Sequence, residues 1–444
     1  MRLSTKKIIV GLNEKLGSER FKKNHITNPI FFTRNRCINF TIVMVSLINK
    51  LSKSLSIEIT KYLQRFGQSI VSKQAFSKAR YKVSHQAFIE LNETFVTSYY
   101  SQGEYQLFRN RYLLLAADGS DYELPWQPED IIEEFGTHDN GQGQPKCLSK
   151  GVNIWDVVNQ INISSSFGTY RKSEKAYFKD AWKSTLNLLD EAKFKAKKLL
   201  LLDALYPQFA LMARLSTENT DFIISCGASF CREVIVFMKT QKEEATLVIP
   251  IFSDSDRKSV FKKQYPNLII PQEIKVRVIR LRLENEPDRC LLISLGLKEF
   301  DSKEIQQIFL MRWGQETSFR FDKSRSEVEN FASKKGEGIY QEFYANLFAN
   351  NLTQLLIQDA QLLLDEKQKS KNNKHHYYIN QSVAKGLMKD ELPVLLHQLE
   401  DTDKFCNRMI ELFLKNTVPR IPNRSFPRQR KHKLKFSMNY RRIF

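Results

Sequence analysis

One stretch of the chain, residues 309–323, combines residue types that suit chemistry on an anionic substrate. It reads F-L-M-R-W-G-Q-E-T-S-F-R-F-D-K. At about 100° per residue, a helix would place Phe309, Arg312, Glu316 and Lys323 within an arc of about 60°. A carboxylate and two cations therefore share one narrow stripe between apolar flanks. Because buried charge is costly unless it is paired or used in chemistry, we expect Glu316 to belong to a metal-binding active site on nucleic acid.

Two further carboxylates each follow a run of apolar residues. The run Y-L-L-L-A-A at 112–117 ends in D-G-S, which begins at Asp118, and L-L-L-L at 199–202 ends in D-A-L-Y-P, which begins at Asp203. A continuous apolar run predicts a strand that is buried on both faces. The carboxyl ends of such strands are where open α/β folds place functional groups, so we expect both aspartates at strand ends, each followed by a turn.

Three carboxylates on two strands and a helix offer the hard oxygen ligands that Mg²⁺ prefers. Two such ions held close together serve phosphodiester cleavage or transfer, and Arg312 and Lys323 would then hold backbone phosphates beside them. Each residue alone also has an ordinary explanation. Asp118 and Asp203 are suitable turn or helix caps, and Glu316 with Arg312 is a suitable i, i+4 pair. The sequence contains no P-loop, zinc-protease or nucleophile-elbow motif that would favour another chemistry.

The elements before Asp118 predict a small helical domain. Residues 1–30 are polar and basic, which favours a loosely ordered arm. Helices are expected from Phe40 and from Ser56, then a break at Gly67 and a basic helix from Ser72. This is the layout of a helix-turn-helix, and we expect its last helix to contact DNA through three exposed cations: Lys73, Lys78 and Arg80. A purely structural helical bundle has the same layout.

The elements after Asp118 predict an α/β unit that is interrupted by strands. Residues 152–158 and 161–167 indicate a hairpin, and residues 173–197 indicate a long helix. A block of about five strands follows between 221 and 297, including V-I-V-F-M at 234–238. Its basic strand, Lys275 to Arg282, suits either a nucleic-acid groove or a solvated face.

The resulting division has five parts. They are an N-terminal helical DNA-binding domain at 1–105, the first part of a catalytic core at 106–220, a β-strand insertion at 221–300, the second part of the core at 301–370, and a C-terminal helical region with a basic tail at 371–444.

The net charge of +20 over 444 residues is concentrated at the two ends. Residues 1–100 carry 17 Lys+Arg against 5 Asp+Glu, and residues 420–444 carry 9 against 0, which leaves the middle near neutrality. Two basic ends predict contacts with an anionic polymer, although basic termini also aid solubility. The apolar run at 38–48 is too short for a bilayer, and we expect no membrane contact and a cytoplasmic, nucleoid-associated protein. The six scattered cysteines indicate reduced thiols.

The motif set resembles the DDE transposases of bacterial insertion sequences. D-G-S at Asp118, L-D-A-L-Y-P around Asp203 and the spacing Phe309-(2)-Arg312-(3)-Glu316-(6)-Lys323 are similar to the family-four group, which is defined by Tyr-(2)-Arg-(3)-Glu-(6)-Lys. The resemblance extends through most of the chain, from S-K-Q-A-F-S-K-A-R near the N-terminus to Y-A-N-L-F-A-N-N-L after Glu316.

This resemblance implies an α/β fold with a ribonuclease-H-like core, and a β-strand insertion between the second aspartate and the glutamate. It implies cut-and-paste transposition with Asp118, Asp203 and Glu316 as catalytic metal ligands for two Mg²⁺ or Mn²⁺ ions. End cleavage, a DNA hairpin intermediate and strand transfer would act on terminal inverted repeats and target DNA held by a homodimer. The family's tyrosine is Phe309 here, so one hydroxyl expected at a DNA phosphate is missing, and we expect weakened activity. A transposase-derived DNA-binding protein, or a nuclease without strand transfer, is the alternative.

Overall fold

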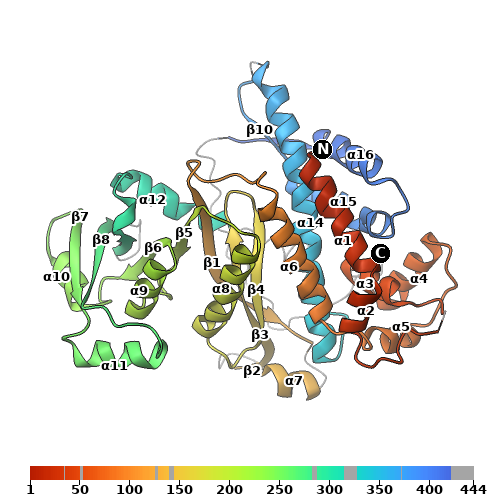
Figure 1. Cartoon of the computed structure of the whole chain (residues 1–444), viewed down its shortest axis with the longest axis horizontal. Helices are drawn as coiled ribbons and strands as arrows, with labels where there is room; N and C mark the ends of the chain where they lie inside the picture. Colours follow the sequence, from red (N-terminus) through yellow and green to blue (C-terminus); the bar gives the residue numbers. More distant parts are fainter. Residues whose placement is uncertain are drawn as a thin grey trace.

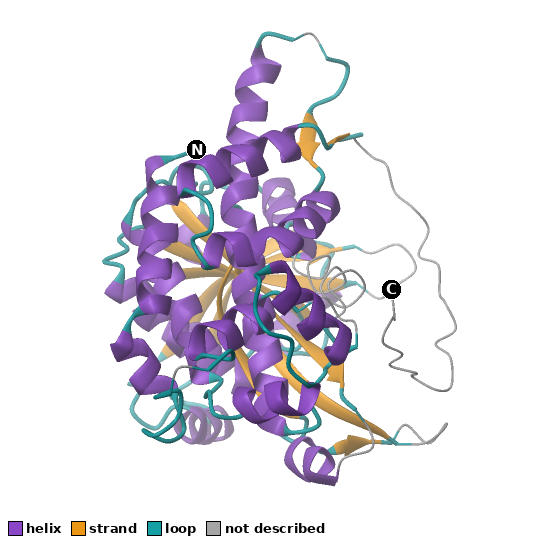
Figure 2. Cartoon of the chain, turned by 90° about the vertical axis from the view of Figure 1, so that its right-hand side faces the viewer, coloured by secondary structure: helices purple, strands orange, loops and turns teal. Residues whose placement is uncertain are grey.

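The computed structural model describes residues 1–34, 36–50, 54–125, 129–139, 145–282, 288–314, 328–371 and 373–421. Over these residues the protein is a mixed α/β structure in which a nine-stranded sheet is flanked by helices (Figures 1 and 2). Most of the N-terminal and C-terminal helices gather on one side of the sheet's first strands, on the right in Figure 1. Among the described helices, none combines the length and the apolar composition needed to cross a membrane.

The centre of the sheet is built from the two apolar runs identified in the sequence. They form β1 (Tyr112–Glu123) and β5 (Lys197–Leu202), which pair in parallel, and β5 pairs in parallel with β6 (Thr220–Gly227). On the other side of β1 lies the predicted hairpin, β3 (Lys146–Asp156) and β4 (Ile161–Thr169), with the short β2 (Thr137–His138) also on β3. The strand order is therefore β4-β3-β1-β5-β6.

The strands of the predicted insertion extend this same sheet. β9 (Arg289–Ser294) pairs antiparallel with β6, β8 (Glu273–Leu281) pairs with β9, and β7 (Glu244–Pro250) forms the edge. The strand predicted at 234–238 is wrong, because this segment lies in the helix α10 (Arg232–Lys239). Val234 and Phe237, three residues apart, are its buried residues, whereas Val236 is 58% exposed, and that pattern is helical.

The N-terminal segment is helical and packed, so the predicted loose arm is wrong. α1 (Leu3–Gly17) and α2 (Glu19–His25) carry a stripe of buried residues, Ile8, Leu12 and Leu16 among them. A spacing of four residues is typical of the apolar face of a helix. The prediction missed this face because it was based on the overall composition of the segment, which is rich in lysine. The backbone N–H of Arg2 also donates to Asp359 at 2.9 Å, so the start of the chain is fixed to the C-terminal half.

The remaining helices surround the sheet and one long central helix. They are α3 (Phe40–Ile48), α4 (Leu55–Arg65), α5 (Lys73–Arg80), α6 (Gln86–Ser101), α7 (Glu129–Phe135), α8 (Glu174–Glu191), α9 (Phe209–Thr217), α11 (Ser255–Gln264), α12 (Ser302–Leu310), α14 (Gly336–Lys369), α15 (Gln381–Leu396) and α16 (Thr402–Leu414), with a small pair of strands, β10 (Tyr377–Ile379) and β11 (Thr417–Pro419). α14 packs against α3, α6, α15, α16 and β4, and it therefore connects the N-terminal helices to the sheet.

A buried ion network fixes the N-terminal helices to α14. Glu342 on α14 is 3% exposed and pairs with Lys50 at 2.6 Å and with Arg80 at 2.9 Å. Arg80 is 1% exposed and also donates to Gln341 and to the carbonyl of Gly338. The prediction that Arg80 is exposed toward DNA is therefore wrong. Its side chain lies on the inward stripe of α5, one position past Ala79, and its charge is neutralised inside the protein.

Candidate active site at the ends of the central strands

The register of the two central strands brings the two predicted aspartates together. β1 and β5 pair from Tyr112 opposite Lys197 to Ala116 opposite Leu201, a constant offset of 85 residues. The same offset joins Asp118 to Asp203, since 203 − 118 = 85. Both side chains belong to half-buried residues, and Asp203 accepts the backbone N–H of Leu205 at 2.9 Å just after β5 ends. The paired residues end at Ala116 and Leu201 and β5 ends at Leu202, so the register directs Asp118 and Asp203 toward the same end of two neighbouring parallel strands.

The local structure at Asp118 differs from the predicted strand end. β1 continues to Glu123 and stays paired with β3, with Asp118 opposite Asn153, so the expected turn after Asp118 is wrong. Gly119 does not form a turn but makes room for a neighbouring side chain. A Cβ at Gly119 would lie 2.2 Å from Cδ of Glu174, the first residue of α8. Glycine at this position lets the Glu174 side chain lie directly against the backbone of β1.

A cation from the predicted stripe reaches Asp118. Asp118 alternates onto the same face of β1 as Leu114 and Ala116, whose side chains belong to one apolar cluster with residues of α12. Arg312 follows α12 by two residues, and its Nη1 lies 3.7 Å from Oδ2 of Asp118. Only 8% of the Arg312 side chain is exposed, so the ion pair is screened less than a surface pair.

Phe309 belongs to the same apolar cluster and is 5% exposed. The guanidinium carbon of Arg312 lies 5.6 Å from its ring centroid. Phe309 therefore helps to support the cation that faces Asp118. The uninterrupted helix predicted over 309–323 is wrong, because α12 ends at Leu310 and Arg312 lies in the turn that follows it. The predicted contacts of Phe309 and Arg312 with DNA stay predictions.

Glu316 and Lys323 lie outside the described residues, within the segment 315–327. The residues on either side of that segment are both near the Asp118 face of the sheet. A Cβ at Gly314 would lie 3.0 Å from the ring of Trp155, and Val328 lines one pocket together with Trp155 and Asn153. Trp155 and Asn153 lie on β3, where Asn153 is opposite Asp118. The predicted roles of Glu316 as ligand and Lys323 as phosphate contact stay predictions.

Two residues beside the aspartates were missed in the sequence. The O–H of Tyr206, three residues after Asp203, donates to Oε1 of Glu174 at 2.6 Å, and Tyr206 is 1% exposed. Burial raises the pKa of Glu174, the hydrogen bond from Tyr206 lowers it, and the negative charge of Asp203 raises it further. The available signals were the tyrosine of D-A-L-Y-P and the glutamate next to Ser173, the residue that caps α8.

The described residues were also tested as a metal site. They contain no group of three or more His, Cys, Asp or Glu side chains placed to hold a metal ion. Asp118 and Asp203 supply hard oxygen donors of the kind that suits Mg²⁺, but a three-carboxylate set depends on Glu316. The pair therefore fits the predicted metal in donor type, with the third ligand beyond the described part of the chain.

The remaining basic residues fall into two groups. Lys73 and Lys78 are exposed on α5, whose N-cap Ser72 accepts the N–H of Ala75, and their contact with DNA stays a prediction. The cations of β8 are neutralised by neighbours instead. Arg277 pairs with Glu244 at 2.7 Å, and Lys275, Arg280 and Arg282 each pair with a carboxylate as well. The strand face of β8 is thus an internally balanced surface.

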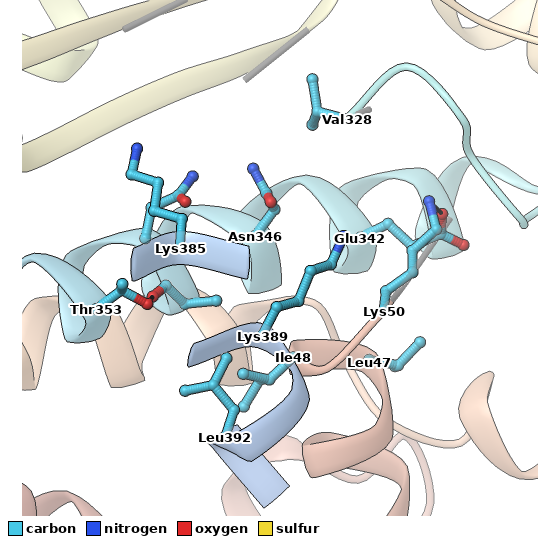
Figure 3. Close-up of a pocket in the computed structure, with 12 residues that line it drawn as sticks. Leu47, Ile48, Lys50, Val328, Glu342, Asn346, Thr353, Lys385, Lys389 and Leu392 are labelled. Atoms are coloured by element: carbon cyan, nitrogen blue, oxygen red, sulfur yellow. Dashed lines mark hydrogen bonds and ion pairs between the residues drawn. The ribbon is translucent and has the colours of Figure 1, made fainter. Parts of the chain in front are cut away.

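A polar pocket separates α14 from α15 (Figure 3). Lys389 of α15 extends across it toward Glu342 of α14, and Lys385 and Asn346 also line it. Its volume of about 40 Å³ holds a few water molecules and no nucleotide. This pocket is therefore too small to be a substrate site.

Comparison with solved structures gives a distant similarity to a transposase complex. No family model matches the chain, and no curated protein matches it in sequence. Among solved structures, the piggyBac transposase synaptic complex with hairpin DNA, determined by cryo-electron microscopy, matches with a TM-score of 0.48 and 9% sequence identity. The match covers 94% of this chain and 87% of that chain. At this TM-score and identity, the similarity assigns neither an activity nor a partner to the protein.

Proposed function

We propose that this protein is a DDE-type transposase of the family-four group, which cuts the ends of an insertion sequence and joins them to target DNA. The observation that carries the proposal is the parallel register of β1 and β5, which directs Asp118 and Asp203 toward the same end of the sheet, with Arg312 located 3.7 Å from Asp118. The order of these residues along the chain is the order of the family motifs. Cleavage, a hairpin intermediate and strand transfer on paired ends held by a homodimer are part of the proposal.

The strand arrangement supports a ribonuclease-H-like core. β4, β3 and β1 are successive antiparallel neighbours, whereas β1, β5 and β6 are parallel. On this interpretation β1, β3, β4, β5 and β6 are the core, and β7, β8 and β9 are the strands inserted between Asp203 and Glu316. The insertion differs from the expected separate domain because it continues the core sheet through β9 and β6.

We assign the roles of the site residues from their positions. Asp118, Asp203 and Glu316 would hold two Mg²⁺ or Mn²⁺ ions, which when bound activate the attacking oxygen and stabilise the leaving oxygen of the phosphodiester. Glu316 follows Gly314 by two residues, a length of chain that spans no more than about 7 Å. Arg312 would orient Asp118 and bind the substrate phosphate that approaches Asp118. Lys323 would bind the same phosphate. Lys73 and Lys78 would contact DNA farther from the cleaved bond.

The test is cleavage of the element's own terminal-repeat DNA by purified protein with Mg²⁺ or Mn²⁺. Asp118→Asn and Glu316→Gln should each slow nicking about a hundredfold or more, since metal ions supply several kcal/mol of transition-state stabilisation. The matched control is Asp121→Asn, an exposed carboxylate three residues along the same strand, which should cut at the wild-type rate.

Three results would replace this proposal. A mobility shift without metal-dependent nicking would identify a DNA-binding protein derived from a transposase. Nicking without joining of the ends to a target would identify a nuclease. Equal nicking by wild type and Glu316→Gln would remove Glu316 from the site.

A further inference from the structure

A second cavity lies among the N-terminal helices, between the loop at 30–38 and the helix α5. Its volume is about 770 Å³, within the range of sites that bind drug-sized ligands. Its walls combine two aromatic rings with four cations: Phe31, Phe32, Arg34, Arg36, Lys78 and Lys82. The described residues that line it include no carboxylate. The cavity thus offers an apolar surface and a positive field to one ligand.

The two phenylalanines of the loop are held in different ways. Phe32 has a φ of 54°, a left-handed conformation that bulky residues rarely adopt and that persists where surrounding structure enforces it. Its ring packs edge-on against Phe40 with centroids 6.0 Å apart, which anchors the loop to the core. Phe31 is half-buried outside the apolar core, and Nζ of Lys82 lies 4.9 Å from its ring centroid. Phe31 therefore presents an aromatic face to the cavity region.

The cations around the cavity are not neutralised by the protein. Arg34, Arg36 and Lys78 are exposed, and neither they nor Lys82 form an ion pair with a carboxylate in the described part of the chain. The cations of β8, by contrast, are each paired with an acidic neighbour. A concave surface with unbalanced positive charge attracts an anion from outside the protein.

We propose that this cavity binds an unstacked nucleotide of a nucleic-acid strand. The base would stack on Phe31, and the adjoining phosphates would lie near Arg34, Arg36 and Lys78. Aromatic platforms combined with a cationic path are the means by which proteins bind single strands. A base that is paired and stacked in a duplex cannot enter, so the site selects single-stranded or locally opened nucleic acid. The strand is favoured over a free nucleotide because Lys73 and Lys78 continue the positive surface along α5.

The inference goes beyond the proposed transposase activity and is tested without divalent ions. The full-length protein is titrated into a labelled single-stranded 12-mer and into the duplex of the same sequence, and binding is followed by fluorescence anisotropy. Phe31→Leu keeps apolar volume but removes the aromatic face, and Phe31→Ala removes both. The matched control is Phe252→Ala, because Phe252 is also a partly exposed ring with a lysine, Lys258, 3.8 Å from its centroid.

Phe31→Leu should weaken single-strand binding about tenfold, the effect of losing one base–aromatic stack, and should change duplex binding far less. Phe252→Ala should leave both affinities unchanged. Lys78→Gln should lower the slope of log K against log salt by about 0.7 for the single strand. The titration contains no divalent ion and measures binding, not cleavage, so failure of the catalytic proposal and failure of this one are distinguishable.

Equal effects of Phe31→Leu and Phe252→Ala would overturn the inference, as would equal losses for single strand and duplex. Displacement of the 12-mer by adenosine monophosphate at a concentration equal to that of its nucleotides would assign the cavity to a free nucleotide and overturn the strand assignment.

Discussion

Replacing Gly119 by alanine tests whether Glu174 is held against β1 beside the aspartates. The added Cβ would lie 2.2 Å from Cδ and 2.5 Å from Oε2 of Glu174, far inside contact distance. The flexible Glu174 side chain must therefore turn away and release the O–H of Tyr206. Because Tyr206 is 1% exposed, its hydroxyl would be left buried without this acceptor.

The magnitude follows from the bond that is lost. A hydrogen bond to a charged group contributes about 1.5–3 kcal/mol, and alanine in place of glycine inside a strand returns about 0.5–1 kcal/mol. Gly119→Ala should therefore destabilise the protein by about 1–2 kcal/mol, seen as a lower urea midpoint at pH 7. The control is Gly227→Ala at the end of β6, where a Cβ meets no atom within 4 Å, and it should be neutral or slightly stabilising.

A double-mutant cycle decides whether the effect passes through Glu174. In the Glu174→Ala background the obstruction is gone, so Gly119→Ala should stabilise the protein by about 0.5–1 kcal/mol, and the coupling should be about 1.5–3 kcal/mol. Additive effects, within about 0.5 kcal/mol, would refute the contact between the two residues. Equal destabilisation by Gly119→Ala and Gly227→Ala would show a general effect of alanine in these strands instead.

Three further predictions concern the ion network and the family motif. Although burial raises it, the charges of Lys50 and Arg80 lower the pKa of Glu342 to about 2. The pKa of Glu342 is thus lower in the folded protein than in the unfolded chain. About 3 kcal/mol of stability should therefore be present above pH 4.5 and be lost as the pH falls toward 2. Glu342→Gln should remove this pH dependence from urea unfolding curves. Arg80→Ala should cost about 3–5 kcal/mol because it leaves a buried carboxylate with one partner fewer, whereas Lys73→Ala on the exposed side of the same helix should leave the urea midpoint nearly unchanged. Phe309→Tyr should speed terminal-repeat cleavage about fivefold, the value of one hydrogen bond of about 1 kcal/mol, and an unchanged rate would show that the missing hydroxyl is irrelevant.

The sequence was most informative where a local pattern determines the structure. Apolar runs that are buried on both faces specified β1 and β5. Because the two strands pair in parallel, the carboxylates that follow these runs are directed toward the same end of the sheet. The hairpin of β3 and β4 was readable for the same reason. Phe309 and Arg312 lie side by side as expected, although the turn after α12, and not a continuous helix, brings Arg312 to Asp118.

The errors arose where partners are distant in the chain. Arg80 resembles the exposed cations around it, and only Glu342, more than 250 residues away, reveals that it is buried. Glu174 carries no motif, because its importance comes from a contact with the backbone at Gly119. The segment 1–30 was judged by its charges, although its apolar residues already had helical spacing.

The buried ion network around Glu342 fixes the position of α5 relative to the proposed catalytic site. Buried ion pairs contribute little net stability compared with apolar packing, but they are geometrically specific because each charge requires its partner. Arg80 lies at the end of α5, and Lys50 follows α3, so both helices are held in one orientation on α14. α14 also packs on β4, the neighbour of β3, which pairs with β1 at Asp118. A nucleic-acid strand bound at α5 would therefore meet Asp118 at a fixed distance, and replacing both Arg80 and Glu342 by apolar residues should impair cleavage more than it impairs folding.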